Sequence, residues 1–410
     1  MVDNALSPHG GKIVERVVPT PAEKLRGLTQ VPIRGPQARE CLGIAYGFFS
    51  PLEGFLTAAD VDSVVKNMTL ASGYVWSIPL VFDLSEGQIK EMGIKEGGKL
   101  LLTYQDQPFA TLDVEEIFSY DKELMAKNVY GTTDPKHPGV KRTQAYQDKF
   151  VGGKVTIVNP PVINPPFDGF WFPPKAQREL FAQRGWKKVV AHQTRNVPHA
   201  GHEWLMKGAW FAANADAILV NPVIGEKRPG DYIDEAILLS HDILRKAGYF
   251  REDIHTTSLL LWDMRYAGPR EAVFHAIVRK NLGCTHHMFG RDHAGVGTYY
   301  DTYAAHRIFN ELPDLGIYPV KTLEWWYCPV CAGIAYEEQC AHKQEAQRFS
   351  GSLIRSIIED GVKPPRLIFR PEVFDLVMES AEKYGHGSPF VNEAYLKRPD
   401  PVMTIPAMQL

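Results

Sequence analysis

The sequence predicts three consecutive parts: a mostly-β, barrel-like N-terminal domain, an α/β domain with a parallel sheet, and a small C-terminal domain with a metal site and helices. Short apolar runs between turn signals fill the first part, and strands alternate with helices in the second. The third begins with clustered cysteines and continues into helical segments. We place the three parts at residues 1–168, 169–323 and 324–410.

The composition is typical of a folded globular protein and argues against several functions. Of 410 residues, 44% are hydrophobic and 23% are charged, and 45 Lys and Arg nearly balance 48 Asp and Glu. The net charge of −3 argues against capture of nucleic acid by bulk charge. No apolar run reaches the ~18–20 residues that cross a bilayer, and residues 1–12 show no basic stretch followed by an apolar one. We therefore expect a cytoplasmic protein without a signal peptide that binds neither nucleic acid nor a membrane.

The N-terminal part contains three runs that predict strands, at residues 75–84, 97–105 and 107–120. A proline-rich segment follows at 159–174, with six prolines in sixteen residues. Because proline is excluded from central strands and helix interiors, this segment predicts a boundary rather than a regular element.

The middle part alternates between strands and helices, as a parallel α/β sheet requires. Its predicted strands are 187–193, 215–223, 258–264 and 285–292. The predicted helices between and after them are 202–215, 234–248 and 269–283. Near the C-terminus, an amphipathic stretch at 352–361 predicts a further helix.

Each predicted strand of the middle part runs into a polar loop. Three of these loops contain arginine, at 193–196, 264–270 and 290–295, and the fourth is 221–225. Because ligands bind parallel sheets at the carboxyl ends of the strands, the four loops together predict one convergent pocket for anions.

The loop QTRNVPHAGH (193–202) joins a strand to a helix. Pro198 suits the start of a helix, and His199 and His202, three residues apart, share one face of its first turn. Gly201 lets a ligand approach the backbone, and the helix N-terminus offers N–H groups to a phosphate. On spacing alone, the alternative is a histidine pair that only caps or packs the helix. A metal site from this pair lacks an obvious third ligand.

His-x-Gly-His after a strand resembles the signature of the nucleotidylyltransferase superfamily, and the whole 193–202 string resembles one family within it, ATP sulfurylase (sulfate adenylyltransferase). Further strings that match this family are GRDHAG (290–295), MRYAGPREA (264–272), GFFSPLEGFL (47–56), SPHGG (7–11), HPGV (137–140) and VGGKV (151–155). Because these ordered matches extend from residue 7 to about 300, the chain is identified as a member of the family. The resemblance implies a PUA-like N-terminal barrel and a Rossmann-like nucleotidylyltransferase domain.

The resemblance also implies roles for the first loop. Thr194, Arg195 and Asn196 match catalytic residues of the family, and Asn196 also counts among the substrate-binding residues. Gln193 and Arg195, with the backbone of Ala294, would hold sulfate. An arginine suits this role because its planar fork matches an oxyanion and keeps its charge.

For the nucleotide, the resemblance implies that His199 and His202 bind the ATP phosphates and stabilise the transition state. The residues that would hold the rest of the nucleotide are Gly290, Arg291, Asp292 and His293. The alternative for Asp292 is that it only orders its own loop through hydrogen bonds to backbone N–H groups. Val197 lengthens the first loop by one residue relative to the usual Asn-Pro pattern but leaves both histidines in place.

The implied reaction joins sulfate to the α-phosphate of ATP and yields adenosine 5′-phosphosulfate and pyrophosphate, with Mg²⁺ accompanying ATP and pyrophosphate. Sulfate has no proton to lose, so the site needs positioning and electrostatic stabilisation rather than a general base. We expect a direct in-line attack that can also run toward ATP. The family forms homo-oligomers, with dimers, trimers and hexamers all open; we expect a dimer or a trimer.

The C-terminal cysteines predict a structural metal site. Cys328 and Cys331 form a Cys-x₂-Cys turn, and Cys340 and His342 follow after eight residues. Four such ligands would complete tetrahedral zinc and leave no open position. Cobalt would fit the same geometry, and three unrelated buried cysteines are the alternative. A zinc site at this place resembles a bacterial and archaeal subgroup of the family that includes enzymes of dissimilatory sulfur metabolism.

Two other functions fit parts of the sequence. A non-catalytic RNA-binding protein would account for a PUA-like domain and a zinc module, but the net charge and the lack of basic and aromatic strips argue against it. A nucleotidylyltransferase with another acceptor would leave Gln193 and Arg195 without a sulfate to hold. Pyrophosphate release that depends on sulfate or molybdate distinguishes these possibilities.

Overall fold

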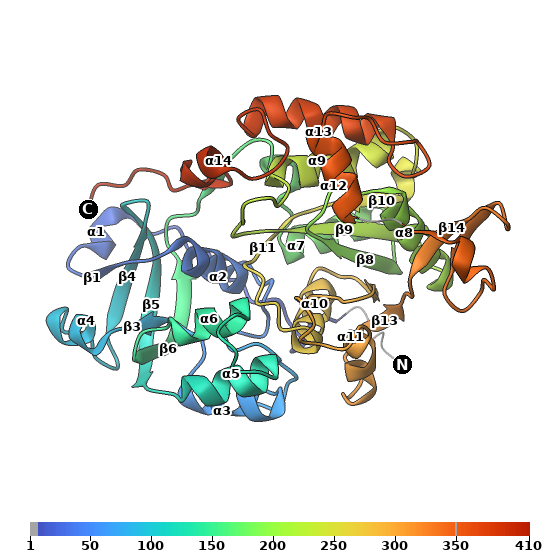
Figure 1. The fold of residues 1–410 in the computed structure, drawn as a ribbon. Helices are drawn as coiled ribbons and strands as arrows, with labels where there is room; N and C mark the ends of the chain where they lie inside the picture. Colours follow the sequence, from blue (N-terminus) through green and yellow to red (C-terminus); the bar gives the residue numbers. More distant parts are fainter. Residues whose placement is uncertain (1–6, 349–350) are drawn as a thin grey trace.

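The N-terminal part is built on a mostly antiparallel sheet (Figure 1). The computed structural model describes residues 7–348 and 351–410. The strand order is β1–β4–β5–β6–β2, with β3 also paired to β6, and every pair is antiparallel except β1–β4. The strands are β1 (Thr29–Pro32), β2 (Gly54–Phe55), β3 (Asp83–Leu84), β4 (Lys99–Tyr104), β5 (Gln107–Phe118) and β6 (Lys149–Ile157).

Two of the three strands predicted here are confirmed, as β4 and β5. The predicted strand 75–84 pairs with the sheet only at β3, because Pro79 interrupts the run and has no N–H for a ladder hydrogen bond. The helices of this part are α1 (Ala22–Leu25), α2 (Gly35–Ala45), α3 (Ala58–Asn67), α4 (Glu86–Glu91), α5 (Lys122–Tyr130) and α6 (Pro138–Gln144).

The middle part contains a parallel sheet with the order β10–β9–β8–β12–β13, and β11 also pairs with β9. Its strands are β8 (Val189–Thr194), β9 (Ala217–Ile224), β10 (His255–Thr257), β11 (Leu260–Leu261), β12 (His286–Phe289) and β13 (Tyr318–Lys321). The predicted single strand 258–264 is wrong: the chain forms β10 and β11 instead. The break falls at Leu259, whose N–H donates to Phe170 O in the proline-rich segment rather than to β9.

Helices cover both faces of this sheet, and the helices predicted from periodicity are confirmed as α8, α9, α10 and α12. The C-terminal helices share a hydrophobic cluster with the sheet, since Ile354 and Val373 pack with Val190 and Ile218. The helices are α7 (Pro174–Gln183), α8 (Ala200–Ala212), α9 (Asp234–Lys246), α10 (Pro269–Asn281), α11 (Ala304–Arg307), α12 (Gly351–Glu359), α13 (Pro371–Tyr384) and α14 (Glu393–Lys397).

A small antiparallel sheet with the order β15–β14–β16 projects beside α8 (Figure 1). We call it the ribbon; it comprises β14 (Trp325–Cys328), β15 (Gly333–Tyr336) and β16 (Gln347–Arg348). All three strands belong to residues 325–348, directly after the parallel sheet ends at β13.

The C-terminal tail returns to the N-terminal sheet and ends beside α1 (Figure 1). In the tail, β17 (Met403–Thr404) pairs with β7 (Val162–Ile163) of the proline-rich segment. Tyr104 Oη donates to Asp400 at 2.8 Å, and Met408 N donates to Gln107 at 2.8 Å. The tail therefore packs against the turn between β4 and β5 of the first sheet.

Charged contacts fix the first sheet's domain against the loop that follows β11. Arg39 donates two hydrogen bonds of 2.9 Å to the Asp263 carboxylate, and Arg265 pairs with the buried Glu40. Asn281 of α10 donates to backbone carbonyls of the 48–50 segment. These contacts hold the 263–270 loop in a defined position at the edge of the parallel sheet.

Among the described residues, no helix is both long enough and apolar enough to cross a bilayer. Residues 1–6, half of the N-terminal stretch from which we predict no signal peptide, lie outside the described residues.

Candidate active site

The carboxyl ends of β8 and β12 carry two of the predicted site loops. β8 ends at Thr194, whose hydroxyl accepts a hydrogen bond from Asn196 N at 3.1 Å and turns the chain toward α8. Because β8 and β12 are parallel neighbours, the loop after β12, from Gly290 to Ala294, lies at the same edge of the sheet. The two loops therefore face a common space, as expected for an open parallel sheet.

His199 and His202 cap the N-terminus of α8. His199 Nδ1 accepts a hydrogen bond from Gly201 N at 3.0 Å, and His202 Nδ1 accepts one from His199 N at 3.3 Å. Burial lowers the pKa of His202 to about 4 and holds the pKa of His199 well below its usual value. Both rings are therefore neutral at pH 7. Because Nδ1 accepts in each ring, Nε2 carries the proton and can donate to a ligand.

A cavity of about 350 Å³ lies against this cap. It brings together six of the residues predicted for the substrate site: Gln193, His199, His202, Gly290, Arg291 and His293. Apolar side chains complete its wall: Leu205, Met288, Leu323 and Trp325. A smaller cavity of about 130 Å³ adjoins it at His293 and includes Asp292. The arrangement joins polar donors on one side with an apolar surface on the other.

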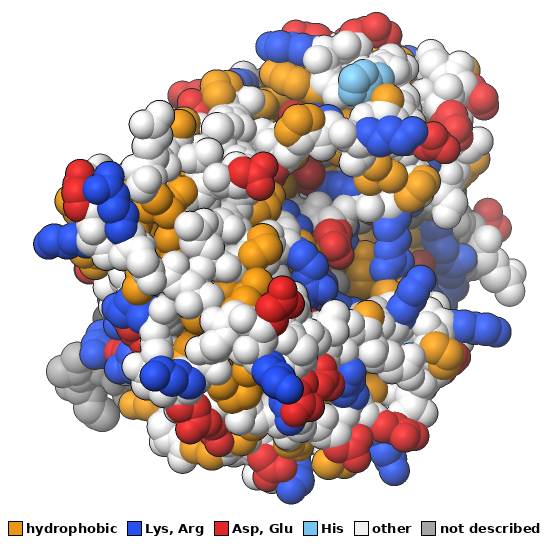
Figure 2. Space-filling view, turned by 90° about the vertical axis from the view of Figure 1, so that its left-hand side faces the viewer, with side chains coloured by type: hydrophobic (Ala, Val, Ile, Leu, Met, Phe, Trp, Pro, Cys, Tyr) orange, Lys and Arg blue, Asp and Glu red, His pale blue; other side chains and the backbone are white. Residues whose placement is uncertain are grey.

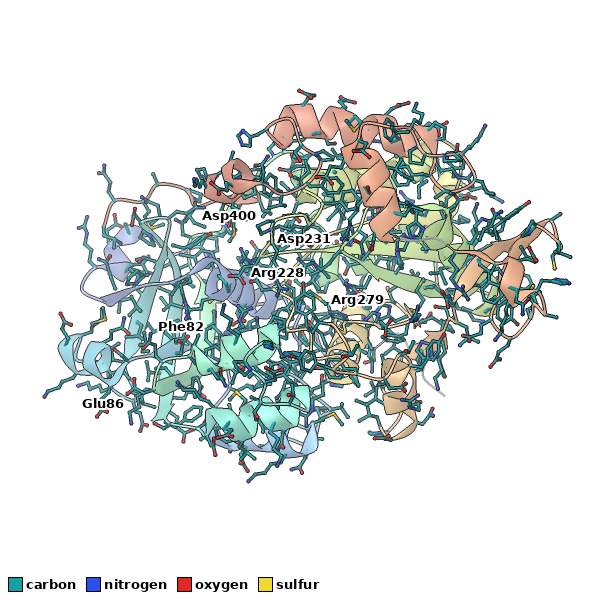
Figure 3. All side chains as sticks on the ribbon, in the orientation of Figure 1. Phe82, Glu86, Arg228, Asp231, Arg279 and Asp400 are labelled. Atoms are coloured by element: carbon teal, nitrogen blue, oxygen red, sulfur yellow. The ribbon has the colours of Figure 1, made fainter. Side chains whose placement is uncertain are left out.

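Arg195 lines neither cavity and lies in a separate network. Its guanidinium donates to Tyr266 Oη at 2.6 Å and to the Glu226 carbonyl at 3.0 Å, and it lies 3.6 Å from the Asp231 carboxylate. Figure 3 shows Asp231 near the centre of the molecule, beside Arg228 of the same loop. The side chain is only 15% exposed, so its direction is set by these contacts.

Asn196 and Ala294 form hydrogen bonds that connect their loops to other segments of the chain. Arg355 of α12 donates to Asn196 Oδ1 at 2.8 Å, and His241 Nε2 donates to the Asn196 carbonyl at 3.1 Å. Ala294 has a φ of +55° and its carbonyl accepts from Gly268 N at 3.0 Å. This bond ties the loop after β12 to the loop that carries Tyr266.

Asp292 is half exposed and its carboxylate lies 3.5 Å from the Arg291 guanidinium. Its backbone carbonyl accepts a hydrogen bond from Gly295 N at 3.1 Å, and its φ of +52° bends the loop. The residue thus orders its loop through the backbone, while its carboxylate pairs with a neighbouring charge.

Further buried histidines lie at and behind the cavity wall, and burial lowers the pKa of each: His192, which lines the cavity, and His241, His275 and His287. Several contacts connect them to the predicted residues. His275 Nδ1 lies 3.0 Å from His293 Nε2, and the His192 and His202 ring centroids are 6.0 Å apart. The space behind the cavity is therefore filled by neutral imidazoles.

Arg279 of α10 is fully buried beside this histidine group (Figure 3). It donates to the carbonyls of Asn221 and His275, and no carboxylate of the described residues forms an ion pair with it. Burial lowers the pKa of Arg279 to about 9, and the charge of Arg279 lowers the pKa of His275 and His293. A cation buried at this position adds a positive contribution to the potential in the adjoining cavity.

Basic side chains also gather on the outer surface between the N-terminal domain and the parallel sheet. A cavity of about 410 Å³ there includes Arg34, Lys141, Arg142 and Arg228 in its wall, together with the acidic Glu40, Asp83 and Glu226. Figure 2, seen from the side of the N-terminal sheet, shows basic side chains around a hollow in this face. Because the four basic groups share the wall with three acidic ones, its excess of positive charge is small.

The cysteine and histidine side chains of the ribbon form one cluster whose four ligand atoms all lie within 4.8 Å of one another. Cys331 and Cys340 have their sulfurs 3.9 Å apart, and Cys328 Sγ lies 3.7 Å from His342 Nδ1. Zinc–sulfur bonds of ~2.3 Å in a tetrahedron place two sulfurs about 3.8 Å apart, so the set can hold a metal ion. Cys331 N donates to Cys328 Sγ at 3.4 Å, and this bond lowers the pKa of the Cys328 thiol to about 7. His342 N donates to Cys340 Sγ at 3.4 Å.

Comparisons with known proteins agree with this architecture. The ATP-sulfurylase family model matches residues 168–380, and the model of a PUA-like domain matches residues 6–160. A sulfate adenylyltransferase of Archaeoglobus fulgidus is 42% identical over 448 aligned positions that cover 98% of each chain. The chain belongs to the ATP sulfurylase family.

Other members and one solved structure extend this result. A sulfate adenylyltransferase of Hyperthermus butylicus is 42% identical over 94% of this chain and 97% of its own. A hexameric APS kinase from Thiobacillus denitrificans has the same fold, with a TM-score of 0.71 and 21% identity over 92% of this chain and 68% of its own. The predicted family, fold class and enzyme type, a sulfate adenylyltransferase, are therefore confirmed.

Sequence reasoning missed the residues that hold the ATP sulfurylase loops from behind. Tyr266 lies inside a matched string, but no pattern indicated that its hydroxyl contacts Arg195. The buried histidines stand on strands and helices that the sequence predicted, but no pattern singled them out. Arg279 lies at the end of a helix whose periodicity gives no sign of an unpaired charge. Each of these contacts depends on strand register, which the sequence does not state.

Proposed function

We propose that the chain joins sulfate to the α-phosphorus of ATP by a single in-line displacement, which releases pyrophosphate and leaves adenosine 5′-phosphosulfate. The supporting observation is the 350 Å³ cavity, in which Gln193, the His199–His202 cap and the loop after β12 face one another. A sulfate oxygen forms a bond to phosphorus while the bond from phosphorus to the α,β-bridging oxygen breaks. No proton is transferred, because sulfate is fully ionised.

The sulfate is assigned to Gln193, Arg195 and the backbone at Ala294. Arg195 is held in place by Tyr266 and the Glu226 carbonyl, and this supports a fixed rather than a mobile cation. A guanidinium has five N–H groups, and those that these two bonds leave over can donate to an oxyanion. Thr194 and Asn196 set the turn that presents it, and we assign them to catalysis through that turn.

The phosphates are assigned to His199 and His202. Both rings are neutral and protonated at Nε2, so they donate hydrogen bonds without adding charge. The N-terminus of α8, a helix of 13 residues, adds a favourable dipole for an anion. Donors fixed before the reaction stabilise charge that develops on the leaving pyrophosphate.

The rest of the nucleotide is assigned to the loop from Gly290 to His293, with Asp292 at its turn. Mg²⁺ enters bound to ATP and leaves bound to pyrophosphate, and we assign no residue of this chain to it. The buried charge of Arg279 supports the binding of two anions, sulfate and a triphosphate, in one place.

The ribbon is assigned a structural zinc ion, held by Cys328, Cys331, Cys340 and His342. Three thiolates and one imidazole are ligands that zinc prefers, and four protein ligands leave no position for a reacting water. Metal analysis of the purified protein distinguishes zinc from cobalt. A protein without either metal would contradict the assignment.

We also propose the assembly and the location. The proposed assembly is a homo-oligomer, either a dimer or a trimer. The proposed location is the cytoplasm, which agrees with the thiolate cluster because thiolates need a reducing compartment. The division at residues 1–168, 169–323 and 324–410 stays a prediction, and limited proteolysis tests it.

The stereochemistry at phosphorus tests the central proposal. The experiment uses ATP in which sulfur replaces one oxygen of the α-phosphate, so that the α-phosphorus is chiral. A first control must show that pyrophosphate release depends on sulfate. One displacement inverts the configuration. Net retention would require two displacements through a covalent adenylyl-enzyme, and it would overturn the proposal.

A further inference from the structure

The ribbon supplies both metal ligands and part of the wall of the substrate cavity. Leu323, Glu324 and Trp325 line the 350 Å³ cavity, and Cys328 follows three residues later on β14. Figure 1 places β14 beside α8, the helix that carries the histidine cap. The metal cluster and the cavity are therefore joined by one strand of four residues.

Side chains along β14 alternate between the two sites, because successive residues of a strand point to opposite faces. Trp326 is buried and packs with Cys328 and Cys340 of the cluster. Trp325, on the opposite face, lines the cavity and stacks against Tyr336 of β15 with ring centroids 5.6 Å apart. A displacement of β14 at Trp326 and Cys328 would therefore also displace Trp325 in the cavity wall.

The ring of Trp325 is also fixed from the side of α8. A Cβ atom placed on Gly208 would come within 2.8 Å of this ring, so the indole lies directly on the helix backbone. Because Gly208 has no side chain, the indole can pack against the α8 backbone. The ring therefore lies between α8 and Tyr336 of the ribbon.

The ribbon is too small to hold Trp325 by packing alone. Its hydrophobic cluster contains four buried residues, and two of these are metal ligands, Cys328 and Cys340. Sheets of this size usually need a metal or disulfides for stability. The ligands Cys331, Cys340 and His342 lie in the two connections between the strands, so a bound metal would tie both connections to β14.

The chemistry of this wall fits a nucleobase rather than phosphates. Leu205, Met288, Leu323 and Trp325 present apolar or aromatic surface. The charge of Glu324 beside them is paired with Arg348 at 3.2 Å and with Arg291 at 3.8 Å. Aromatic side chains bind bases by stacking on their faces. The phosphate donors His199 and His202 line the same cavity, and Leu205 of its apolar wall follows His202 on α8.

We propose that the metal ribbon forms the base-binding wall of the nucleotide site, and that bound metal keeps Trp325 in contact with the adenine of ATP. The inference rests on the proposed function, since it assigns the base within the same cavity. Loss of the metal weakens the binding of ATP and adenosine while pyrophosphate still binds. The metal thereby controls nucleotide affinity without touching the substrate.

Equilibrium binding tests this coupling. ATP, adenosine and pyrophosphate are titrated separately, without sulfate, into four samples: metal-loaded wild type, chelated wild type, chelated wild type reloaded with zinc, and metal-loaded Trp325→Ala. We expect the Kd of ATP and adenosine to rise about tenfold on chelation and in Trp325→Ala, the size of a lost base–aromatic stack. Reloading restores the affinity, and the Kd of pyrophosphate stays within about twofold throughout, because the stacking effect is confined to the base.

Two further variants sharpen the test. Trp325→Phe keeps an aromatic face and should retain most of the affinity. Tyr327→Ala removes an aromatic residue from the same face of β14, two positions away and outside the cavity wall, and should bind ATP like the wild type. If chelation unfolds the protein, as circular dichroism would show, the metal-loaded Trp325→Ala and Tyr327→Ala pair decides the assignment of the base.

Unchanged ATP and adenosine binding in Trp325→Ala would overturn the inference. Unchanged binding in folded, chelated wild type would overturn the role of the metal. The proposed function fails separately, if metal-loaded wild type releases no sulfate-dependent pyrophosphate.

Discussion

The metal cluster and the catalytic cavity both depend on histidine, but the chain assembles them in opposite ways. The four cluster ligands lie within residues 328–342, on one strand and the two connections of a small sheet. The cavity draws its wall from residues as far apart as His192 and Trp325. A site whose residues lie in neighbouring turns can be predicted from their spacing in the sequence. A site at the end of a parallel sheet can be predicted only when the order and register of the strands are known. The first is sensitive to the removal of one ion, and the second to the loss of single donors.

The largest effect is expected where one side chain holds the acceptor substrate. Arg195→Lys should nearly abolish turnover, because an ammonium cannot reproduce the two-pronged contact or the bonds to Tyr266 and Glu226. Steady-state kinetics at saturating ATP and sulfate measures this, with circular dichroism to show that the fold persists. Activity within about tenfold of the wild type would mean that Arg195 does not hold sulfate.

The next effect distinguishes capping from ligand binding at α8. His199→Asn and His202→Gln retain side chains that favour helix capping at these positions, but they lose the imidazole donor. Each should lower kcat by about 30- to 1000-fold, equivalent to ~2–4 kcal/mol for one preorganised donor, and should raise the KM for ATP much less. If kcat stays near the wild-type value while thermal stability is normal, the two histidines only cap the helix.

The buried histidines should make the protein unstable in acid. Burial lowers the pKa of His202 to about 4 and that of His241 and His293 to about 3, far below the value of 6.5 in an unfolded chain. Between about pH 6.5 and pH 4 the unfolded chain therefore binds protons that the folded chain does not, so the free energy of unfolding falls as the pH falls. Urea unfolding at a series of pH values measures the slope.

Variants at two histidines test the origin of this slope. His241→Gln should make the pH dependence shallower, since it removes one buried imidazole. The exposed His386 has a φ of +53°, so His386→Asn suits the backbone and should leave the slope unchanged. Equal slopes in both variants would contradict the assignment to buried histidines.

The smallest effect on turnover is expected at the metal cluster. Cys331→Ser should lower the thermal midpoint but leave kcat at saturating ATP and sulfate within about threefold, because a closed four-ligand site supplies folding energy and no reacting group. Calorimetry and kinetics on the same preparation separate the two quantities. A loss of kcat as large as in the α8 variants would mean that the ribbon takes part in the chemical step.

The elements that the sequence predicted are those with a clear local pattern. β8, β9 and β12 are short apolar runs that end in polar loops, and α8–α10 follow helical periodicity. The spacing also predicted the four side chains that the structure brings together in the ribbon, including His342. The break between β10 and β11 was not predicted, because it arises where Leu259 N turns to Phe170 O, far away in the sequence.

Within the site, the resemblance supplied residue identities and the structure supplied their surroundings. The network that holds Arg195 and the unpaired charge of Arg279 depend on which strands are neighbours. Sequence periodicity indicates which side of a helix or strand is buried, but it does not indicate which residues of other elements pack against that side. For this reason nothing in the sequence singled out the buried histidines at the cavity.

The contact of the C-terminal tail with the first sheet has a consequence for how the protein is made. Tyr104 and Gln107 flank the turn between β4 and β5, but their partners, Asp400 and Met408, follow 296 and 301 residues later in the chain. During translation, this turn therefore stays without these contacts until residues 400–408 have been made. Ribosome-bound chains of increasing length should show the turn open to protease until these residues emerge.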